Sequence, residues 1–122
     1  MSEKTPTPTE INFHQKSHEL EIAFDDGSRF HFPSEFLRVH SPSAEVRGHA
    51  PGEETLQLGK ENVNIESMEP VGNYAIKIAF TDGHDSGIFS WDLFHEYGLN
   101  QEKMWQDYLQ KLEDAGHERK LN

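Results

Sequence analysis

Apolar and polar residues alternate along two separate stretches of the chain, and this alternation predicts two β-hairpins. Asp26-Gly27 lies between the last two strands of the first stretch, and Asp82-Gly83 has the same place in the second. Such Asp-Gly pairs favour tight hairpin turns. The predicted strands cover residues 11–15, 19–24, 29–32, 63–68, 74–80 and 88–89.

The two stretches share the sequence Ile-Ala-Phe-x-Asp-Gly, which begins at Ile22 in the first and at Ile78 in the second. Each copy continues into an aromatic strand and then a helix start, with Ser34 and Ser90 as the predicted N-caps. One interpretation is an internal repeat of a hairpin–helix unit, since a single hairpin is hardly stable alone. The alternative is chance similarity between two ordinary Asp-Gly hairpins.

A final helix is predicted between the N-cap Asn100 and the stop residue Gly116, with Leu99 and Met104 as a hydrophobic staple. Its apolar stripe predicts packing on a core, Trp105 and Tyr108 included. The fold class is therefore α+β: two β-hairpin–helix units in a mainly antiparallel sheet, capped by a C-terminal amphipathic helix. The residues predicted to share one core are Phe24, Phe30, Phe32, Phe80, Ile88 and Phe89.

Length and charge narrow the possible functions. The 122 residues suit one domain, predicted over residues 11–115 between a disordered tail (1–10) and a C-terminal tail (116–122). A net charge of −11 disfavours nucleic acid and anionic membranes as partners. The chain has no cysteine, no apolar run of membrane-spanning length and no signal-peptide pattern, so we expect a cytoplasmic protein.

Candidate chemistry gathers around His84, which lies between Asp82 and Asp85. The imidazole can bind a metal or act as a base, or it can simply cap the turn by hydrogen bonding. His40 and His49 flank a predicted long loop, residues 40–54, and would complete a three-histidine zinc or iron site if that loop folded over the second hairpin.

Two arginines near that loop, Arg38 and Arg47, either bracket an anion or neutralise nearby acids, and we favour the second interpretation. The sequence contains no phosphate-binding glycine loop, zinc-protease motif or nucleophile elbow. A non-enzymatic protein is therefore expected.

Several motifs together resemble the gamma-butyrobetaine hydroxylase-like N-terminal domain family, in particular its small free-standing bacterial members. The resemblance covers roughly Ile11 to Leu112. The motifs that carry it are Leu37-Arg38, Ser41-Pro42-Ser43, Gly72-Asn73-Tyr74, Asp82-Gly83-His84 and Ser90-Trp91.

The resemblance implies a comparison with the carnitine-pathway hydroxylases. In those proteins this domain precedes an iron- and 2-oxoglutarate-dependent domain and binds zinc through three cysteines and a histidine. Those positions are Ser41, Ser43, Val46 and His84 here, so we expect a vestigial site without metal, held by hydrogen bonds. Relatives fused to Mrp-type ATPases with iron–sulfur clusters imply an accessory role.

Two hypotheses remain open from the sequence. The first is a non-enzymatic accessory or protein-interaction module without a cofactor, whose partner is a protein. The second is a zinc- or iron-binding domain that uses His84 with His40, His49, Asp82 or Asp85.

Overall fold

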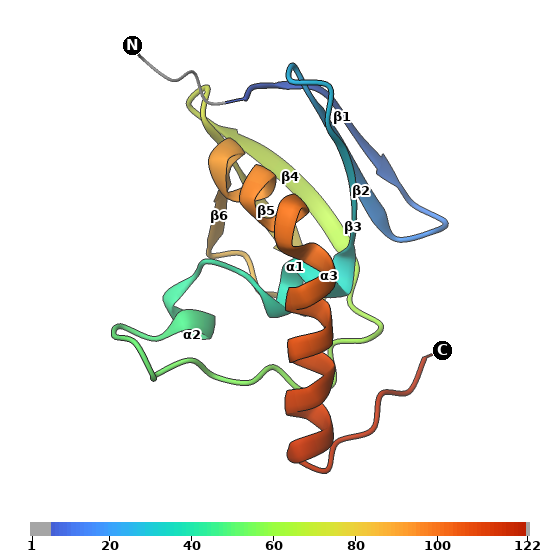
Figure 1. The fold of residues 1–122 in the computed structure, drawn as a ribbon, viewed down its shortest axis with the longest axis vertical. Coiled ribbons are helices and arrows are strands. Elements are labelled where there is room, and N and C mark those ends of the chain that lie inside the picture. The colour runs from blue at the N-terminus through green and yellow to red at the C-terminus, as the bar shows by residue number, and fades with distance from the viewer. Residues whose placement is uncertain (1–5, 122) are drawn as a thin grey trace.

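The two sequence stretches fold as two three-stranded antiparallel sheets, each of which leads into a helix (Figure 1). The computed structural model describes residues 6–121. The strand orders are β1-β2-β3 and β4-β5-β6, so the predicted α+β class is confirmed, with the strands divided between two sheets. The strands and helices are β1 (Pro8–His14), β2 (Glu19–Phe24), β3 (Arg29–Pro33), α1 (Ser34–Val39), α2 (Ala44–Arg47), β4 (Ile65–Val71), β5 (Ala75–Phe80), β6 (Gly87–Ser90) and α3 (Trp91–Asp114).

The turns of the two repeats have the same hydrogen bonds. The amide of Gly27 donates to the Phe24 carbonyl at 3.1 Å, and the amide of Gly83 donates to the Phe80 carbonyl at 3.0 Å. The φ angles of these glycines are 90° and 91°, in the left-handed region that favours glycine. In both repeats the next strand runs directly into a helix, which confirms that the two segments have the same local structure.

Helix α3 is one continuous helix of 24 residues, whereas the sequence predicted two helices separated near Gly98. Ser90 caps it as predicted, accepting a hydrogen bond from the amide of Leu93 at 3.1 Å. The predicted N-cap Asn100 is wrong, because its side chain donates to the Glu96 carbonyl within the helix. Leu99 is 68% exposed, so it forms no hydrophobic staple.

Gly98 has a packing role inside α3. A Cβ atom at this position would lie 2.4 Å from atoms of the Phe30 ring, so the absence of a side chain lets strand β3 approach the helix. Gly98 therefore marks a close contact between the two repeats. The predicted stop at Gly116 is consistent with the structure, since α3 ends at Asp114 and Gly116 has a φ of 72°.

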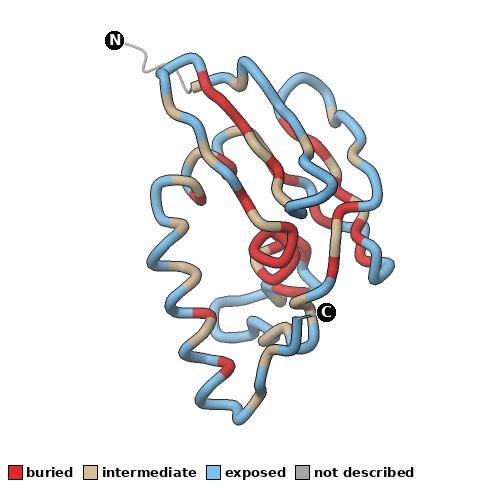
Figure 2. Tube along the Cα trace, turned by 90° about the vertical axis from the view of Figure 1, so that its right-hand side faces the viewer, coloured by how far each residue is buried: buried red, intermediate tan, exposed pale blue. Residues whose placement is uncertain are grey.

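The core lies between the two sheets and the helices, and Figure 2 shows its buried positions concentrated in the strands and α1. Phe32, Phe80 and Phe89 are at most 1% exposed, as predicted. Ile88 was wrongly assigned to the core: it is 46% exposed, because it pairs with Lys77 on the outer face of its sheet. Tyr108 is buried, while Trp105 is only partly buried against the core.

Several boundaries differ from the sequence predictions. Strand β1 begins at Pro8, within the segment predicted to be a disordered tail, whose first five residues lie outside the described part of the chain. Ser34 is the first residue of α1 and not its cap; its hydroxyl hydrogen-bonds His18 and Asn64. Strand β4 continues through Pro70, and the predicted long loop contains the short helix α2.

The segment predicted as a C-terminal tail makes specific contacts where the structure describes it. The Arg119 guanidinium donates to both carboxylate oxygens of Glu35, at 2.9 and 2.5 Å, and lies 5.2 Å from the centre of the Trp105 ring. The Lys120 amide donates to Glu61. Among the helices of residues 6–121, none is both long and apolar enough to cross a membrane.

Candidate functional site

The turn between β5 and β6 directs His84 into the protein. The His84 carbonyl accepts a hydrogen bond from the Phe80 amide at 2.9 Å, and its amide donates to Asp82 Oδ1 at 3.2 Å. The Asp-Gly turn directs the imidazole toward the interior, and His84 is only 8% exposed. The chemistry of the turn therefore positions the histidine that the sequence singled out.

Both ring nitrogens of His84 have partners from the loop that follows α1. Its Nε2 lies 2.9 Å from Ser41 Oγ, and its Nδ1 lies 2.9 Å from Glu45 Oε2. Burial, and next the nearby Arg38 guanidinium, lower the pKa of His84, although Glu45 and Asp82 oppose the shift. In the neutral imidazole, Nδ1–H donates to the Glu45 carboxylate and Nε2 accepts from the Ser41 hydroxyl.

Serine hydroxyls extend this network around Glu45. Ser86 Oγ donates to Glu45 Oε2 at 2.7 Å and lies 2.7 Å from Ser43 Oγ. Ser43 is the N-cap of α2 and accepts from the Glu45 amide at 3.2 Å. The Ser86 hydrogen bond is the main reason why the pKa of Glu45 is lowered. The network fixes residues 41–45 onto the β5–β6 turn.

The order Ser41–His84–Glu45 has the hydrogen-bond pattern of a serine hydrolase triad. The surroundings of Ser41 do not suit a nucleophile, because this residue is 0% exposed. Its Oγ packs against Gly87, where an added Cβ would fall 2.3 Å away. A substrate carbonyl cannot approach this hydroxyl in the folded protein, so the geometry supports a structural role for the triad.

The four positions that the family resemblance connects with zinc do not fit a zinc site. Val46 is a buried apolar side chain, and the hydroxyls of Ser41 and Ser43 are not thiolates. Ser41, Ser43 and His84 do lie together, but their polar atoms bind one another and Glu45. The donors present therefore suit a hydrogen-bonded cluster.

The remaining candidate metal ligands are not brought together. His40 lies on the other side of the loop, where its Nδ1 is 2.8 Å from the Phe36 carbonyl. His49 and Asp85 are exposed. Asp82 accepts from Arg38 Nε at 2.9 Å and from Lys60 Nζ at 2.7 Å. Within the part of the chain that the structure describes, no group of three His, Asp or Glu side chains is arranged to hold an ion.

Asp82 and Arg38 form a second anchor of the same loop. Partial burial raises the pKa of Asp82, but the hydrogen bonds from Lys60, the His84 amide and Arg38 outweigh it and lower this pKa to about 2. Arg38 Nη1 also donates to Gln57 Oε1 at 3.1 Å. Arg38 thus neutralises an acid, as the sequence suggested, and joins the end of the loop to the turn.

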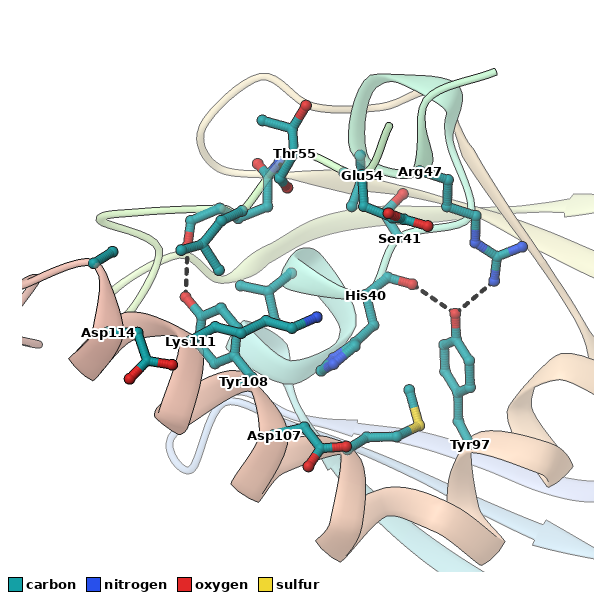
Figure 3. A pocket seen from close by; sticks show the side chains of 16 residues that line it. His40, Ser41, Arg47, Glu54, Thr55, Tyr97, Asp107, Tyr108, Lys111 and Asp114 are labelled. Atoms are coloured by element: carbon teal, nitrogen blue, oxygen red, sulfur yellow. Dashed lines mark hydrogen bonds between the residues drawn. The ribbon is translucent and has the colours of Figure 1, made fainter. Parts of the chain in front are cut away.

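A groove lies between the anchored loop and the second half of α3 (Figure 3). Its cavity has a volume of about 690 Å³. The apolar part of its lining comes from α1, the loop and α3, and consists of Val39, Val46, Leu56, Met104 and the rings of Tyr97 and Tyr108. Charged side chains surround this apolar floor, namely Arg47, Glu54, Asp107, Lys111 and Asp114.

Two tyrosines of α3 reach across the groove to the loop backbone, as Figure 3 shows. Tyr97 Oη donates to the His40 carbonyl and accepts from Arg47 Nη2, each at 2.7 Å. Tyr108 Oη donates to the Gln57 carbonyl at 2.7 Å. Burial raises the pKa of both phenols, that of Tyr108 to about 12, so both remain donors at neutral pH.

Glu45 was not recognised as a site residue from the sequence, and Ser86 was assigned no role there. Ser86 follows Asp85 directly after His84, and this proximity was the available signal for it. Ser43 and Glu45 have the spacing of a helix N-cap with an acidic first turn, but nothing in the sequence connects Glu45 with a histidine 39 positions later. The groove was missed because its walls come from a loop and a helix far apart in sequence.

Comparison with known proteins shows the family. The family model described as gamma-butyrobetaine hydroxylase-like, N-terminal, matches residues 11–95. Two protein structures solved by NMR in solution are 44% and 45% identical to the chain, with TM-scores of 0.83 and 0.80. Each alignment covers 98% of this chain, and 94% and 90% of the respective relatives.

A crystal structure from Acidithiobacillus ferrooxidans, of a protein with unknown function in the DUF971 family, is 34% identical with a TM-score of 0.61. It covers 74% of this chain and 90% of its own. None of the curated proteins compared with the chain matches it. The extent of the family match and the similarity of these structures together show that the chain belongs to the gamma-butyrobetaine hydroxylase-like N-terminal domain family.

Proposed function

We propose that this chain is a non-enzymatic protein-interaction module and that a segment of its partner docks in the groove between residues 40–57 and α3. One observation carries the proposal: an apolar floor inside a charged rim, in a cavity of about 690 Å³. An apolar centre with a polar margin is the usual composition of a protein recognition surface. The accessory role that the family resemblance implies agrees with it.

The groove is well fixed before any partner binds. Its loop wall is anchored by His84 through Ser41 and Glu45, and its helix wall is joined to the loop by the hydroxyls of Tyr97 and Tyr108. A rigid surface loses little conformational entropy on binding, so this support favours recognition.

Two features argue for binding without chemistry. Ser41, the one hydroxyl within residues 6–121 that is hydrogen-bonded to a histidine ring, is buried. Both nitrogens of His84 already have hydrogen-bond partners, so a metal would have to displace Ser41 or Glu45. We therefore propose that the module acts without a metal or another cofactor.

Site-specific photo-crosslinking in cells tests the docking site. p-Benzoylphenylalanine replaces Asp107, which lines the groove, or the adjacent Gln106, which is exposed on α3 and does not line it. We expect an adduct of one discrete mass from position 107 and none from position 106. The crosslinked protein is then identified, purified and titrated with this chain.

Blocking the groove supplies the second arm of the test. Thr55→Trp fills the groove from its exposed loop wall, while Leu58→Trp adds similar bulk on the same loop outside it. We expect Thr55→Trp to weaken the complex by at least about tenfold and Leu58→Trp to leave it unchanged. Equal crosslinking at positions 106 and 107, or equal affinity of the two tryptophan variants, would refute the proposal.

A further inference from the structure

Two basic side chains without an acidic partner line the groove. The chain has 22 acidic and 11 basic residues, so most bases are expected to have a carboxylate neighbour. Within residues 6–121, six of them do, namely Arg29, Arg38, Lys60, Lys77, Lys103 and Arg119. The other four basic residues in this part of the chain form no ion pair, namely Lys16, Arg47, Lys111 and Lys120. Two of them, Arg47 and Lys111, line the groove.

The acids of the groove rim are already engaged by the chain itself. Asp107 accepts from Lys103 Nζ at 3.1 Å, and Asp114 accepts from Gln110 Nε2 at 3.0 Å. Glu54 accepts from the Gly52 amide at 3.2 Å; backbone hydrogen bonds are the main reason why its pKa is lowered, with a smaller contribution from Lys111. Carboxylates carry no donors, so the charged hydrogen-bond donors of the rim are Arg47 and Lys111.

Arg47 is well placed to recognise an anion. Its Nη2 donates to Tyr97 Oη at 2.7 Å, which holds the guanidinium at the edge of the groove. A guanidinium carries five N–H donors, and its planar fork matches a carboxylate. Figure 3 shows Arg47 on the loop wall and Lys111 on the helix wall, so that a ligand in the groove would lie between two positive charges.

The apolar floor adds a second requirement. An inorganic anion would add no apolar contact to the half-buried Leu56 and Met104, whereas an apolar side chain would bury them further. Building on the docking function proposed above, we propose that the groove recognises a polypeptide segment that carries a carboxylate beside an apolar side chain, with Arg47 and Lys111 binding the carboxylate. The carboxylate belongs to a chain end or to an acidic side chain.

Nuclear magnetic resonance titration of the ¹⁵N-labelled protein with four probes tests this inference. The probes are N-acetyl-Leu-Phe with a free carboxylate, its C-terminal amide, N-acetyl-Glu-Phe amide, and hexanoate. We expect at least one of the two carboxylate-bearing peptides to shift signals around Arg47 and Lys111 with a dissociation constant of about 1 mM or lower. The uncharged amide should bind distinctly more weakly. The better of the two peptides shows whether a chain end or an acidic side chain is preferred.

Variants that remove one charge show whether the peptide binds through Arg47 and Lys111. Arg47→Gln and Lys111→Gln should each weaken the peptide by about fivefold to tenfold, because a charge-assisted hydrogen bond is lost. Lys16→Gln is the matched control, since Lys16 is an exposed lysine in the β1–β2 turn, outside the groove. The Lys111 side chain forms no hydrogen bond within residues 6–121, so its replacement tests the charge without disturbing the fold.

Each negative outcome has a distinct meaning. Equal binding of the free acid and the amide, unchanged affinity in both glutamine variants, or no shift at about 5 mM peptide would overturn the inference. Tighter binding of hexanoate than of either peptide would show a site for free organic acids and overturn the polypeptide assignment. If the crosslinked partner binds the Arg47→Gln and Lys111→Gln variants with unchanged affinity, the docking function stands and carboxylate recognition is refuted.

Discussion

Gly98→Ala is expected to destabilise the protein, although the same change in an isolated helix would stabilise it. Gly98 lies inside α3, where alanine is preferred over glycine by about 1 kcal/mol. In the folded protein, however, the added Cβ would lie 2.4 Å from two atoms of the Phe30 ring and 2.6 Å from a third. Carbon atoms in good contact are about 3.5–4.0 Å apart, so the ring has to move by more than about 1 Å.

The expected cost follows from how Phe30 is held. Its ring packs against Phe24, Phe32 and His95, with centroid distances of 6.0, 6.1 and 5.7 Å. Overpacking of this kind costs about 1–3 kcal/mol, and moving the ring also loses some of these contacts. After subtracting the gain of about 1 kcal/mol in helix propensity, and because ring contacts are also lost, we expect a net loss of up to about 2 kcal/mol in the free energy of unfolding.

Urea unfolding followed by circular dichroism measures this difference, and a double-mutant cycle identifies its cause. In a Phe30→Ala background the new Cβ meets no ring, so Gly98→Ala should then stabilise the protein. A coupling energy of about 1–3 kcal/mol between the two positions is expected for residues in contact. If Gly98→Ala stabilises the protein with Phe30 present, the inferred need for a glycine beneath the Phe30 ring is wrong.

Three further predictions concern the anchors of the fold. The folded protein lowers the pKa of His84 and His40 below 6.5, so the unfolded chain binds more protons at mildly acidic pH. The free energy of unfolding should therefore fall as the pH drops below about 6.5, and it should fall less steeply in His84→Gln. An equal pH dependence of the two proteins would contradict this. Arg119→Ala leaves the buried carboxylate of Glu35, 7% exposed, without its partner. Breaking a fully buried ion pair costs about 3–5 kcal/mol, and because Arg119 is partly exposed we expect a smaller loss of about 2–3 kcal/mol in denaturant unfolding. A loss below about 0.5 kcal/mol would show that the contact is dispensable. Protein purified without a histidine tag should contain zinc and iron at well below stoichiometric amounts in elemental analysis, whereas stoichiometric metal that is lost in His84→Ala would overturn the metal-free proposal.

The repeated hairpin–helix plan was predictable because it rests on local chemistry. An Asp-Gly turn, period-two alternation and the Ser90 cap each depend on a few adjacent residues, and both Asp26-Gly27 and Asp82-Gly83 form the expected turns. His84 was found for the same reason, since its position relative to the turn is local. The sequence also indicated which core strands carry the large aromatic residues.

The errors arose where a distant contact decided the local structure. Gly98 and Asn100 are typical of a helix boundary, but α3 runs through both, with the Phe30 ring packed on Gly98. Ile88 has the apolar character of a core residue, yet the register of β5 and β6 places it on the outer face. Glu45 depends on the loop folding back over the turn. No pattern of adjacent residues contains that information.

The two tyrosine hydroxyls of α3 determine how freely the groove can widen. Tyr97 and Tyr108 are separated by eleven helical positions, about 16 Å along the axis, so they hold the loop at both ends of the groove. If each hydrogen bond contributes about 1 kcal/mol, releasing both costs about 2 kcal/mol, and the widened state has a population of about 3%. A bulky ligand that needs the widened state would bind about thirtyfold more weakly than it would bind a groove that was already wide. The groove therefore disfavours large ligands without excluding them.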